Sequence, residues 1–415
     1  MMINLNSIHS NHNWSESPLS TLLVLLKDGT HNPPKRSDIG IPMLSAVNIQ
    51  NGKIIFEENF SLIGEEDYKE IHKKYEIQAG DVLLTVVGTL GRVAEVPKLD
   101  TKFTVQRSVA ILRADNDLLN PRYLRYYIES FDFQKQLKVR SNVTAQAGVY
   151  LGELGKIQIR FPNLEEQSKI AAILSSVDEA IEKTEAIIEQ TEEVKKGLMQ
   201  QLLTKGIGHE NFKKTDIGKI PDEWEVVKMG DVIELISGQS SSINEINYER
   251  KGIAYVTGPE QWNGYHIEET KWVEKPRKIA KENSIFITVK GSGVGTIFLG
   301  GYYAIGRDVM AIVPSEIINK DYLYYLALYQ ARKIVYNKVG IVPGISRGDI
   351  LEFKFGLPKI DEQVRISKVL TSWDKKLTIE KNKRLKLREL KNGLMQSLLT
   401  GKVRVKVNEA EVTQL

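Results

Sequence analysis

Asn32-Pro33-Pro34 is the stretch of this sequence that most closely resembles a catalytic motif. Adenine methyltransferases carry Asn-Pro-Pro followed by an aromatic residue, and they act on a base that has been flipped out of the duplex. Here Lys35 follows the prolines, and it lacks the flat aromatic face on which a flipped base would stack. No cofactor-type glycine motif precedes the stretch after a predicted strand. The motif therefore does not predict a methyltransferase.

Three other residue sets suggest chemistry and fail on spacing or context. The glycines of Gly291–Gly295 could approach a phosphate, but the following TIFLGGYY predicts a strand instead of the helix that would receive a pyrophosphate. We expect a hairpin turn there. Asp222, Glu225 and Lys228 resemble nuclease residues, yet they lie within seven residues of one another in what looks like a domain-opening segment. The six histidines show no metal-ligand spacing, so no metal site is predicted.

Composition is that of an ordinary globular protein with 41% hydrophobic and 27% charged residues. A chain of 415 residues is too long for one ordinary core, so two or three domains are expected. The absence of cysteine fits a reducing compartment, and the polar start of the chain lacks a signal-peptide pattern, so we expect a cytoplasmic protein. The longest apolar run, Leu19–Leu26, is too short to cross a bilayer. A net charge of +4 permits nucleic-acid binding without requiring it.

An internal repeat sets the architecture. The segment Glu165–Gly206 recurs as Asp361–Lys402, at a numbering difference of 196 that holds without a gap from one end to the other. Both copies place apolar residues at three- and four-residue steps between charged ones, which predicts long helices of coiled-coil type. About forty residues at 1.5 Å each would span roughly 60 Å, so these helices are expected to act as spacers.

Charge favours pairing of the two predicted helices with each other. The first copy carries nine acidic and five basic residues, net −4, and the second carries five acidic and eleven basic residues, net +6. Opposite charge and matching apolar seams predict a mixed pair, and a pseudo-two-fold axis would make it antiparallel. The alternative is that each helix packs only on its own domain. The residues expected in the seam and at partner contacts are Ile170, Leu174, Ile181, Leu198, Leu202, Ile366, Leu370, Leu377, Leu394 and Leu398.

The segments before the two helices also repeat. Val82–Gly88 matches Ile285–Gly291, and Asn120–Glu129 matches Asn319–Leu328. Asn120 resembles a helix cap, and Pro121 suits the first helical position, so a helix is predicted over Asn120–Phe133 among short strands and turns. The predicted fold is α+β, with two tandem mixed α/β domains that are each followed by a long helix. The expected boundaries are 1–161, 162–208, 209–357, 358–403 and a polar tail at 404–415.

This sequence resembles the specificity (S) subunit of type I restriction-modification systems over essentially its whole length. The resemblance rests on the paired GLMQ-x-LLT helix ends, the PNLEEQ and PKIDEQ helix entries, the IPDEWEVVKMGD opening, and DGTH followed by a Gly-Ile-Pro strand. It implies two target-recognition domains that each recognise one half of a split, asymmetric DNA site, held apart by an antiparallel helix pair. It also implies docking of two methyltransferase subunits, with restriction subunits joining the complex. The S subunit would be non-catalytic, and S-adenosylmethionine, ATP and Mg would bind to the partners.

DNA contacts are expected in the loops. The pair Gln106-Arg107 is equivalent to the pair Gly306-Arg307, and both lie beside glycine-containing turns. This equivalence favours a shared phosphate or scaffold contact, although a local salt bridge is an equally good account of any one arginine. Base contacts are expected where the copies differ. The other candidates are Thr30, His31, Lys35, Arg36, Arg92, Lys102, Arg140, Asn142, Gln239, Ser240, Lys290, Ser292, Lys338 and Arg347.

Two other functions are compatible with parts of the pattern. A free-standing methyltransferase or nuclease is disfavoured because its motifs are missing from the sequence. A protein-only adaptor would use the duplicated helices to assemble partners without binding DNA. Salt-dependent DNA binding separates the adaptor from the specificity subunit, because neutralising phosphates releases counterions. The DNA target and its spacer length cannot be derived from the sequence.

Overall fold

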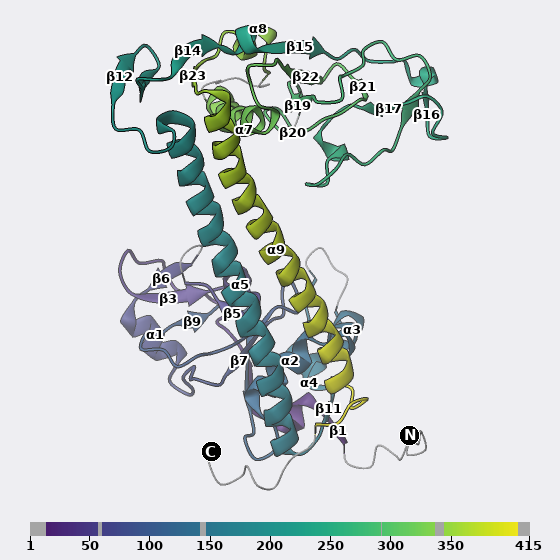
Figure 1. The fold of residues 1–415 in the computed structure, drawn as a ribbon. Coiled ribbons are helices and arrows are strands. Elements are labelled where there is room, and N and C mark those ends of the chain that lie inside the picture. The colour runs from purple at the N-terminus through teal and green to yellow at the C-terminus, as the bar shows by residue number, and fades with distance from the viewer. Residues whose placement is uncertain (1–13, 57–59, 142–146, 292, 337–343, 406–415) are drawn as a thin grey trace, which may run out of the picture. The chain divides into compact units, whose positions relative to one another are not determined.

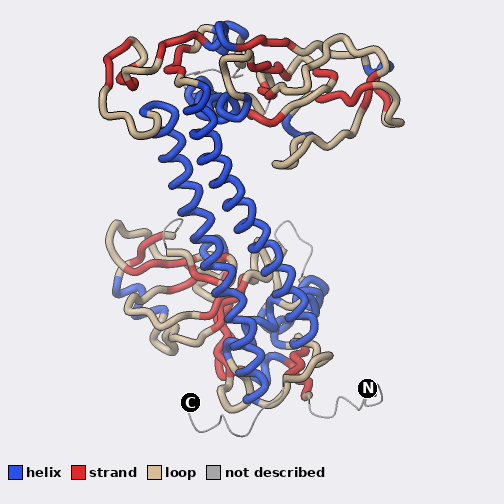
Figure 2. The backbone as a smooth tube through the Cα atoms, in the orientation of Figure 1, coloured by secondary structure: helices blue, strands red, loops and turns tan. Residues whose placement is uncertain are grey.

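The computed structural model describes residues 14–56, 60–141, 147–291, 293–336 and 344–405. The chain divides into two compact units. Unit 1 comprises residues 1–184 and 383–415, and unit 2 comprises residues 185–382. Both units contain strands and helices, and two long helices contribute to both of them (Figure 2). Within the described ranges, none of the helices combines the length and apolar character needed to cross a membrane.

Unit 1 consists of short strands, short helices and one part of each long helix (Figure 1). Its strands are β1 (Ser15–Pro18), β2 (Leu23–Asp28), β3 (Ile41–Leu44), β4 (Ile49–Gln50), β5 (Lys53–Ile54), β6 (Ser61–Ile63), β7 (Val82–Thr85), β8 (Val93–Glu95), β9 (Thr104–Val105), β10 (Val109–Ala114) and β11 (Gln158–Phe161). Its short helices are α1 (Glu65–Ile71), α2 (Pro121–Glu129), α3 (Phe131–Val139) and α4 (Leu151–Gly155), with 3-10 helices η1 (Leu19–Leu22) and η2 (Ala46–Asn48).

Unit 2 repeats this arrangement with different loops. Its strands are β12 (Phe212–Thr215), β13 (Gly218–Pro221), β14 (Glu225–Lys228), β15 (Ile233–Ser237), β16 (Ile246–Asn247), β17 (Ile253–Val256), β18 (Trp272–Val273), β19 (Ile285–Thr288), β20 (Ile297–Leu299), β21 (Ala304–Ile305), β22 (Val309–Pro314) and β23 (Lys354–Leu357). Its short helices are α6 (Met229–Val232), α7 (Lys320–Tyr336), α8 (Arg347–Leu351), η3 (Ile243–Glu245) and η4 (Pro259–Gln261). The long helices are α5 (Leu164–Lys205) and α9 (Ile360–Leu398).

A four-stranded sheet of the same topology forms the centre of each unit. The strand order is β2-β10-β7-β8 in unit 1 and β15-β22-β19-β20 in unit 2. Along β10, Ala110 and Leu112 belong to one core cluster, and Val109 and Ile111 belong to another. Since successive strand residues point to opposite faces, the sheet has a hydrophobic core on each side. A parallel pair, β3 with β9 or β17 with β21, flanks the second core in the respective unit.

The helix predicted at Asn120 begins as expected and ends early. The Asn120 side chain accepts a hydrogen bond from the Tyr123 amide at 3.0 Å, and Pro121 occupies the first turn, as in a standard N-cap. The helix then stops at Glu129 because Ser130 adopts an extended conformation (φ −67°, ψ 153°) and caps α3. A single helix over Asn120–Phe133 is therefore wrong, whereas its counterpart α7 in unit 2 continues without a break.

A buried glutamine fixes the start of each long helix to its own domain. Gln167 accepts a hydrogen bond from the Asn120 amide at 2.8 Å and donates to the Leu118 and Pro162 carbonyls. Gln363 does the same with Asn319, Ile317 and Pro358 in unit 2. Both glutamine side chains are fully buried. Their hydrogen bonds satisfy backbone groups that loops would otherwise bury unpaired, so each glutamine holds its helix in a fixed register on the domain.

The long helices pack against each other within each unit. In unit 1, Ile170 and Leu174 of α5 share a core with Met395 and Leu398 of α9 and with Leu399, which directly follows it. In unit 2, the C-terminal end of α5 shares a core with Ile366 and Leu370 of α9. The start of one helix therefore meets the end of the other in both units, so the two helices are antiparallel. The predicted fold of two mixed α/β domains with an antiparallel helix pair is confirmed.

Candidate nucleic-acid interface

In unit 1, the loop after β2 and the loop before β10 meet at one edge of the central sheet. The Gly29 amide donates to the Val109 carbonyl at 3.0 Å, and the Thr30 amide donates to the Val105 carbonyl at 3.1 Å. The Arg107 amide in turn donates to the Thr30 carbonyl at 3.1 Å. A Cβ added to Gly29 would lie 2.0 Å from the Val105 carbonyl oxygen, so only glycine permits this approach. The Arg107 side chain is exposed on this edge. Thr30, Gln106 and Arg107 are thus brought together, as a shared site requires.

Unit 2 builds the same edge from different side chains. The Gly238 amide donates to the Val309 carbonyl and the Gln239 amide donates to Ile305, each at 3.0 Å. Gly238 is again confined by backbone, because an added Cβ would lie 2.0 Å from the Gly306 carbonyl oxygen. The Arg307 side chain is 73% exposed, and its Nε lies 3.7 Å from the Asp308 carboxylate. At that distance and exposure the ion pair is weak and leaves the guanidinium available.

The remaining candidates divide into accessible and engaged side chains. Lys35, Arg36, Arg92, Ser240 and Lys290 are exposed on loops or turns. His31 is also exposed, and its Nε2 lies 2.6 Å from an Asp28 carboxylate oxygen. Asn142, Ser292 and Lys338 lie outside the described residues.

Three other candidates lie against the chain itself. Arg347 donates through Nη1 to the Leu235 carbonyl at 2.7 Å and so ties α8 to β15. Lys102 lies over the ring of Tyr68, 5.7 Å from its centroid. Arg140 caps α3, where its Nη1 donates to the Gln136 carbonyl at 3.3 Å. These positions indicate scaffold contacts for the three residues.

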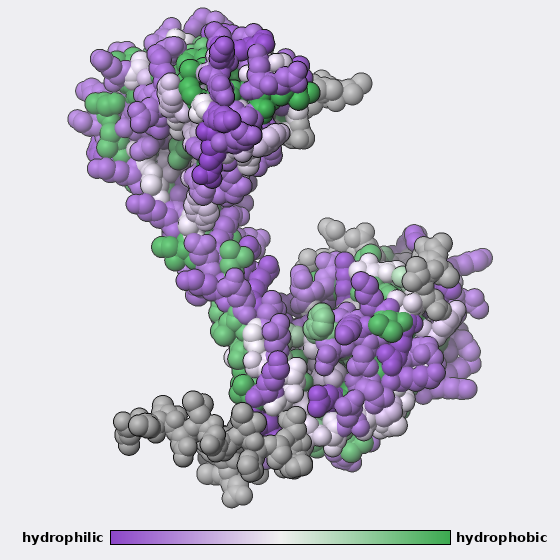
Figure 3. Space-filling model, turned by 90° about the vertical axis from the view of Figure 1, so that its right-hand side faces the viewer, coloured by the Kyte–Doolittle hydropathy of each residue, from purple (hydrophilic) through white to green (hydrophobic). Residues whose placement is uncertain are grey.

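The expected seam residues are occupied by packing inside the chain. Ile170, Leu174, Ile366 and Leu370 are fully buried in the cores that join helix to domain. Ile181, Leu202 and Leu398 are also buried, and Leu198, Leu377 and Leu394 are half-buried. These side chains hold the helices together. Another face of α9 carries exposed apolar residues, which include Ile379 at 64% and Leu385 at 53%. Figure 3 shows separate hydrophobic patches among hydrophilic residues on this face of the molecule, along the helices and on the globular parts.

A polar cluster that the sequence analysis did not identify crosses the helix pair in each unit. In unit 1, Asp178 of α5 accepts from the Tyr126 hydroxyl at 2.8 Å and lies 2.8 Å from the Lys391 ammonium of α9. In unit 2, Asp374 of α9 accepts from the Tyr325 hydroxyl at 2.7 Å and pairs with Lys195 of α5. Because both Asp pairs and Lys pairs are offset by 196, each repeat supplies an aspartate to one cluster and a lysine to the other. In the sequence, the recurrence of these polar residues at equivalent positions of an otherwise apolar seam was the signal that could have identified the two clusters.

The unit 1 cluster is partly buried and densely charged. Arg125 donates through Nη1 to the Asp178 carboxylate at 3.0 Å, and its Nη2 lies 3.0 Å from the Glu129 carboxylate. Glu129 also pairs with the Lys391 ammonium at 3.0 Å. Burial acts to raise the pKa of Asp178, and the hydrogen bonds and charges of Lys391, Arg125 and Tyr126 outweigh it, so the pKa is lowered overall. Asp178 therefore stays ionised at neutral pH.

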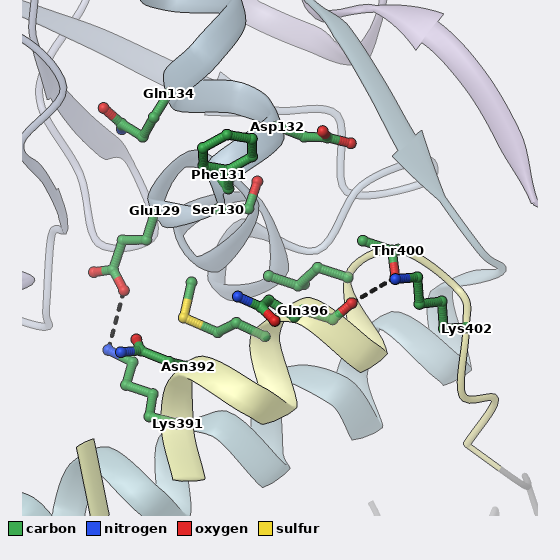
Figure 4. A pocket seen from close by; sticks show the side chains of 12 residues that line it. Glu129, Ser130, Phe131, Asp132, Gln134, Lys391, Asn392, Gln396, Thr400 and Lys402 are labelled. Atoms are coloured by element: carbon green, nitrogen blue, oxygen red, sulfur yellow. Dashed lines mark hydrogen bonds and ion pairs between the residues drawn. The ribbon is translucent and has the colours of Figure 1, made fainter. Parts of the chain in front are cut away.

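An open hollow of about 630 Å³ lies beside this cluster in unit 1 (Figure 4). Its walls come from the junction of α2 and α3 and from the end of α9 with the residues just after it, where Met395 and Leu399 supply apolar surface. Phe131 lines it with a side chain that is 76% exposed. Glu129 and Asp132 face Lys391 and Lys402 around the hollow, so its charge is balanced. Balanced charge does not favour a phosphate backbone, and the hollow is better suited to a protein side chain.

Comparison with known proteins gives a family for this architecture. A family model described as the type I restriction modification DNA specificity domain matches residues 12–193 and again 221–389. The chain belongs to the type I restriction-modification DNA specificity family. The two matches coincide with the two repeats, and each includes one of the sheet edges described above.

Relatives of this specificity family span nearly the whole chain. A Methanocaldococcus jannaschii protein provisionally named the type I restriction enzyme MjaX specificity subunit is 29% identical over 405 residues, covering 95% of this chain and 94% of that protein. The type I restriction enzyme MjaVIII specificity subunit of the same organism is also 29% identical, covering 81% of this chain and 82% of its own.

Solved structures share the fold of the specificity family. A chain from a study of complex assembly and conformational transition in a type I R-M system has a TM-score of 0.63 at 20% identity, covering 96% of this chain and all of that one. An S subunit from M. genitalium has a TM-score of 0.58 at 18% identity, covering 97% and 99%.

These relatives are named as the specificity subunits of type I restriction enzymes, and the matched family model is described as a DNA specificity domain. Among the described residues, no group of three or more His, Cys, Asp or Glu side chains could hold a metal ion. The role of this chain in the complex is to recognise a DNA sequence.

Proposed function

We propose that each unit of this specificity subunit recognises one half of a bipartite, asymmetric DNA site through the edge where its central sheet meets its loops. The observation that carries the proposal is that equivalent backbone hydrogen bonds place Arg107 and Arg307 at the same point of two otherwise divergent surfaces. A shared cation at a fixed point suits a phosphate contact, whereas the differing side chains around it suit base recognition. Two different surfaces require two different half-sites.

The paired helices serve as the scaffold for two methyltransferase subunits, and restriction subunits join through the same complex. Gly197 and Gly393 support this assignment because both are exposed inside long helices, and an added Cβ at either would meet no described heavy atom within 4 Å. A helix-interior glycine costs about 1 kcal/mol relative to alanine, so its recurrence in both repeats suggests close approach of another backbone. S-adenosylmethionine, ATP and Mg would bind to the partner subunits.

Methylation mapping tests the proposal. Cellular DNA is sequenced by a method that detects methylated bases, with and without this chain, while the partner genes are intact. We expect a split methylated motif with a fixed gap only when the chain is present. Exchanging residues 1–160 for those of a relative should change one half of the motif and leave the other unchanged. Unaltered methylation in the absence of this chain would contradict the proposal.

A further inference from the structure

A β-hairpin with an Asn-Gly turn recurs in the two units and has different surroundings in each. In unit 1, Asn51-Gly52 joins β4 to β5 directly after η2, and in unit 2, Asn263-Gly264 lies in a hairpin directly after η4. The preceding 3-10 helix ties each hairpin down in the same way. The Asn48 carbonyl accepts from the Ile55 amide at 2.8 Å, and the Gln261 carbonyl accepts from the Glu268 amide at 2.7 Å. The two hairpins are therefore equivalent elements.

In unit 1 the turn of the hairpin lies against two helices, and its Asn51 and Lys53 side chains stay exposed. A Cβ added to Gly52 would lie 1.9 Å from Nη2 of Arg125, which belongs to α2. The Lys53 ammonium lies 2.9 Å from the Glu182 carboxylate of α5. These contacts hold the turn against α2 and α5, which gives this hairpin a structural role.

In unit 2 the base of the hairpin is fixed and its tip is bare. Trp262 packs against Phe298 with ring centroids 5.9 Å apart and forms a β-bridge with Ile267. The Asn263 Oδ1 accepts from the Tyr265 and His266 amides, each at 3.0 Å, which sets the backbone of the turn. A Cβ added to Gly264 would meet no described heavy atom within 4 Å, and Tyr265 is 59% exposed. A preorganised turn thus presents the exposed side chains of Tyr265 and His266 to solvent, and the His266 Nε2 lies 3.2 Å from the Asn263 Nδ2.

The hairpin of unit 2 is connected to the sheet edge that carries Arg307. The Gly306 amide donates to the carbonyl of Val256 at 2.8 Å, and Val256 lies three residues before the first residue of η4. Pro259 then packs on the turn between β19 and β20, because a Cβ added to Gly293 would lie 2.3 Å from its Cγ. The hairpin is thus attached to the surface proposed to face DNA. Its nearest acid, Glu268, accepts a hydrogen bond from the Asn263 amide group at 3.2 Å.

We propose that the hairpin from Trp262 to Ile267 enters a DNA groove and that Tyr265 and His266 are specificity-determining side chains of unit 2. The inference rests on the proposed function of the two sheet edges. A two-stranded ribbon fits the major groove, and a hydroxyl and an imidazole can both donate to or accept from base edges. The first half-site would lack such a contact, because the turn of the unit 1 hairpin is held against α2 and α5.

The test uses the complete complex with its partner subunits and compares three chains. The variant Tyr265→Ala with His266→Ala should lower the rate of methylation at the wild-type site by about 10-fold or more and relax selectivity at positions in one half only. The slope of DNA affinity against salt should not change, because base contacts release no counterions. The matched control Lys53→Ala alters the hairpin of unit 1 and should leave both half-sites unaffected.

The outcomes distinguish this inference from the proposed function. An unchanged rate and motif in the double variant would overturn the hairpin assignment while leaving the bipartite recognition intact. Failure of the wild-type complex to produce any split motif would overturn the proposed function instead. If the double variant has a lowered melting temperature, the milder pair Tyr265→Phe with His266→Asn decides. Relaxed selectivity in one half then supports the hairpin, and full wild-type selectivity refutes it.

Discussion

Replacing Asp178 by asparagine should destabilise unit 1 measurably, because it removes the charge on which two cations converge. Breaking a fully buried ion pair by deleting one partner costs about 3–5 kcal/mol. Here the Asp178 and Lys391 side chains are 20% and 17% exposed, and Lys391 keeps its second partner Glu129. Both facts reduce the loss, so we expect Asp178→Asn to lower the free energy of unfolding by about 2 kcal/mol. For a unit of this size that corresponds to about 4–8 °C in melting temperature.

Differential scanning calorimetry of the full chain at several pH values is the assay. Because the pKa of Asp178 is lowered in the folded state, its stabilising contribution is present above the unfolded value near 3.9 and is lost as the pH falls through the lower folded value. The difference between wild type and Asp178→Asn should therefore stay constant from about pH 6 to 8 and shrink below about pH 4. The neighbouring Glu179 is exposed and provides a matched control as Glu179→Gln.

A double-mutant cycle with Lys391→Met gives the refuting result. If the ion pair contributes as described, Asp178→Asn and Lys391→Met should be non-additive by about 1 kcal/mol or more. Additive effects, or a loss for Asp178→Asn no greater than that of Glu179→Gln, would show that the cluster does not stabilise the helix pair.

Three further perturbations have defined outcomes. Gln167→Ala should lower the free energy of unfolding, measured by urea denaturation, by about 3 kcal/mol, because it removes three hydrogen bonds and leaves buried backbone groups unpaired. A loss below that of an ordinary surface substitution would show that Gln167 does not fix α5 to its domain. Gly197→Ala with Gly393→Ala should raise the stability of the free subunit by about 0.5–1 kcal/mol per site and weaken assembly with methyltransferase subunits in co-purification. Arg107→Ala should lower the slope of log affinity against log salt by about 1, and an unchanged slope would exclude a phosphate contact.

The repeat made the architecture predictable. Two copies at a fixed offset, with periodic apolar residues in the last forty positions of each, require two domains and two helices whatever the detailed packing. The cap at Asn120 was predictable for the same kind of reason, since it depends on neighbours in sequence. The hairpin turn expected at Gly291–Gly295 is confirmed by the antiparallel pairing of β19 with β20.

What the sequence could not predict depends on contacts between distant segments. The break at Ser130 places Phe133 at the start of α3 and in the core of unit 1, a long-range contact that the serine, although a plausible cap, does not reveal by itself. The binding of Arg347 to the Leu235 carbonyl joins residues 112 positions apart, so its scaffold contact was not visible from its loop. The polar tail expected from residue 404 is likewise tied at its start, where Arg404 and Val405 bind Glu166.

The contact of Val405 with Glu166 has a counterpart in unit 2. The Val405 amide donates to Glu166 Oε1 at 3.2 Å, and the Ile207 amide donates to Glu362 Oε1 at 2.9 Å. In unit 2 the chain runs on from Ile207 to Trp224, whose indole donates to Glu362. In unit 1 the segment after α9 is held in the same way through Val405, and Trp14 packs on Gly401. In each unit, a glutamate in the first turn of one long helix therefore anchors the segment that follows the other long helix, so the antiparallel pair is closed by the same contact at both of its ends.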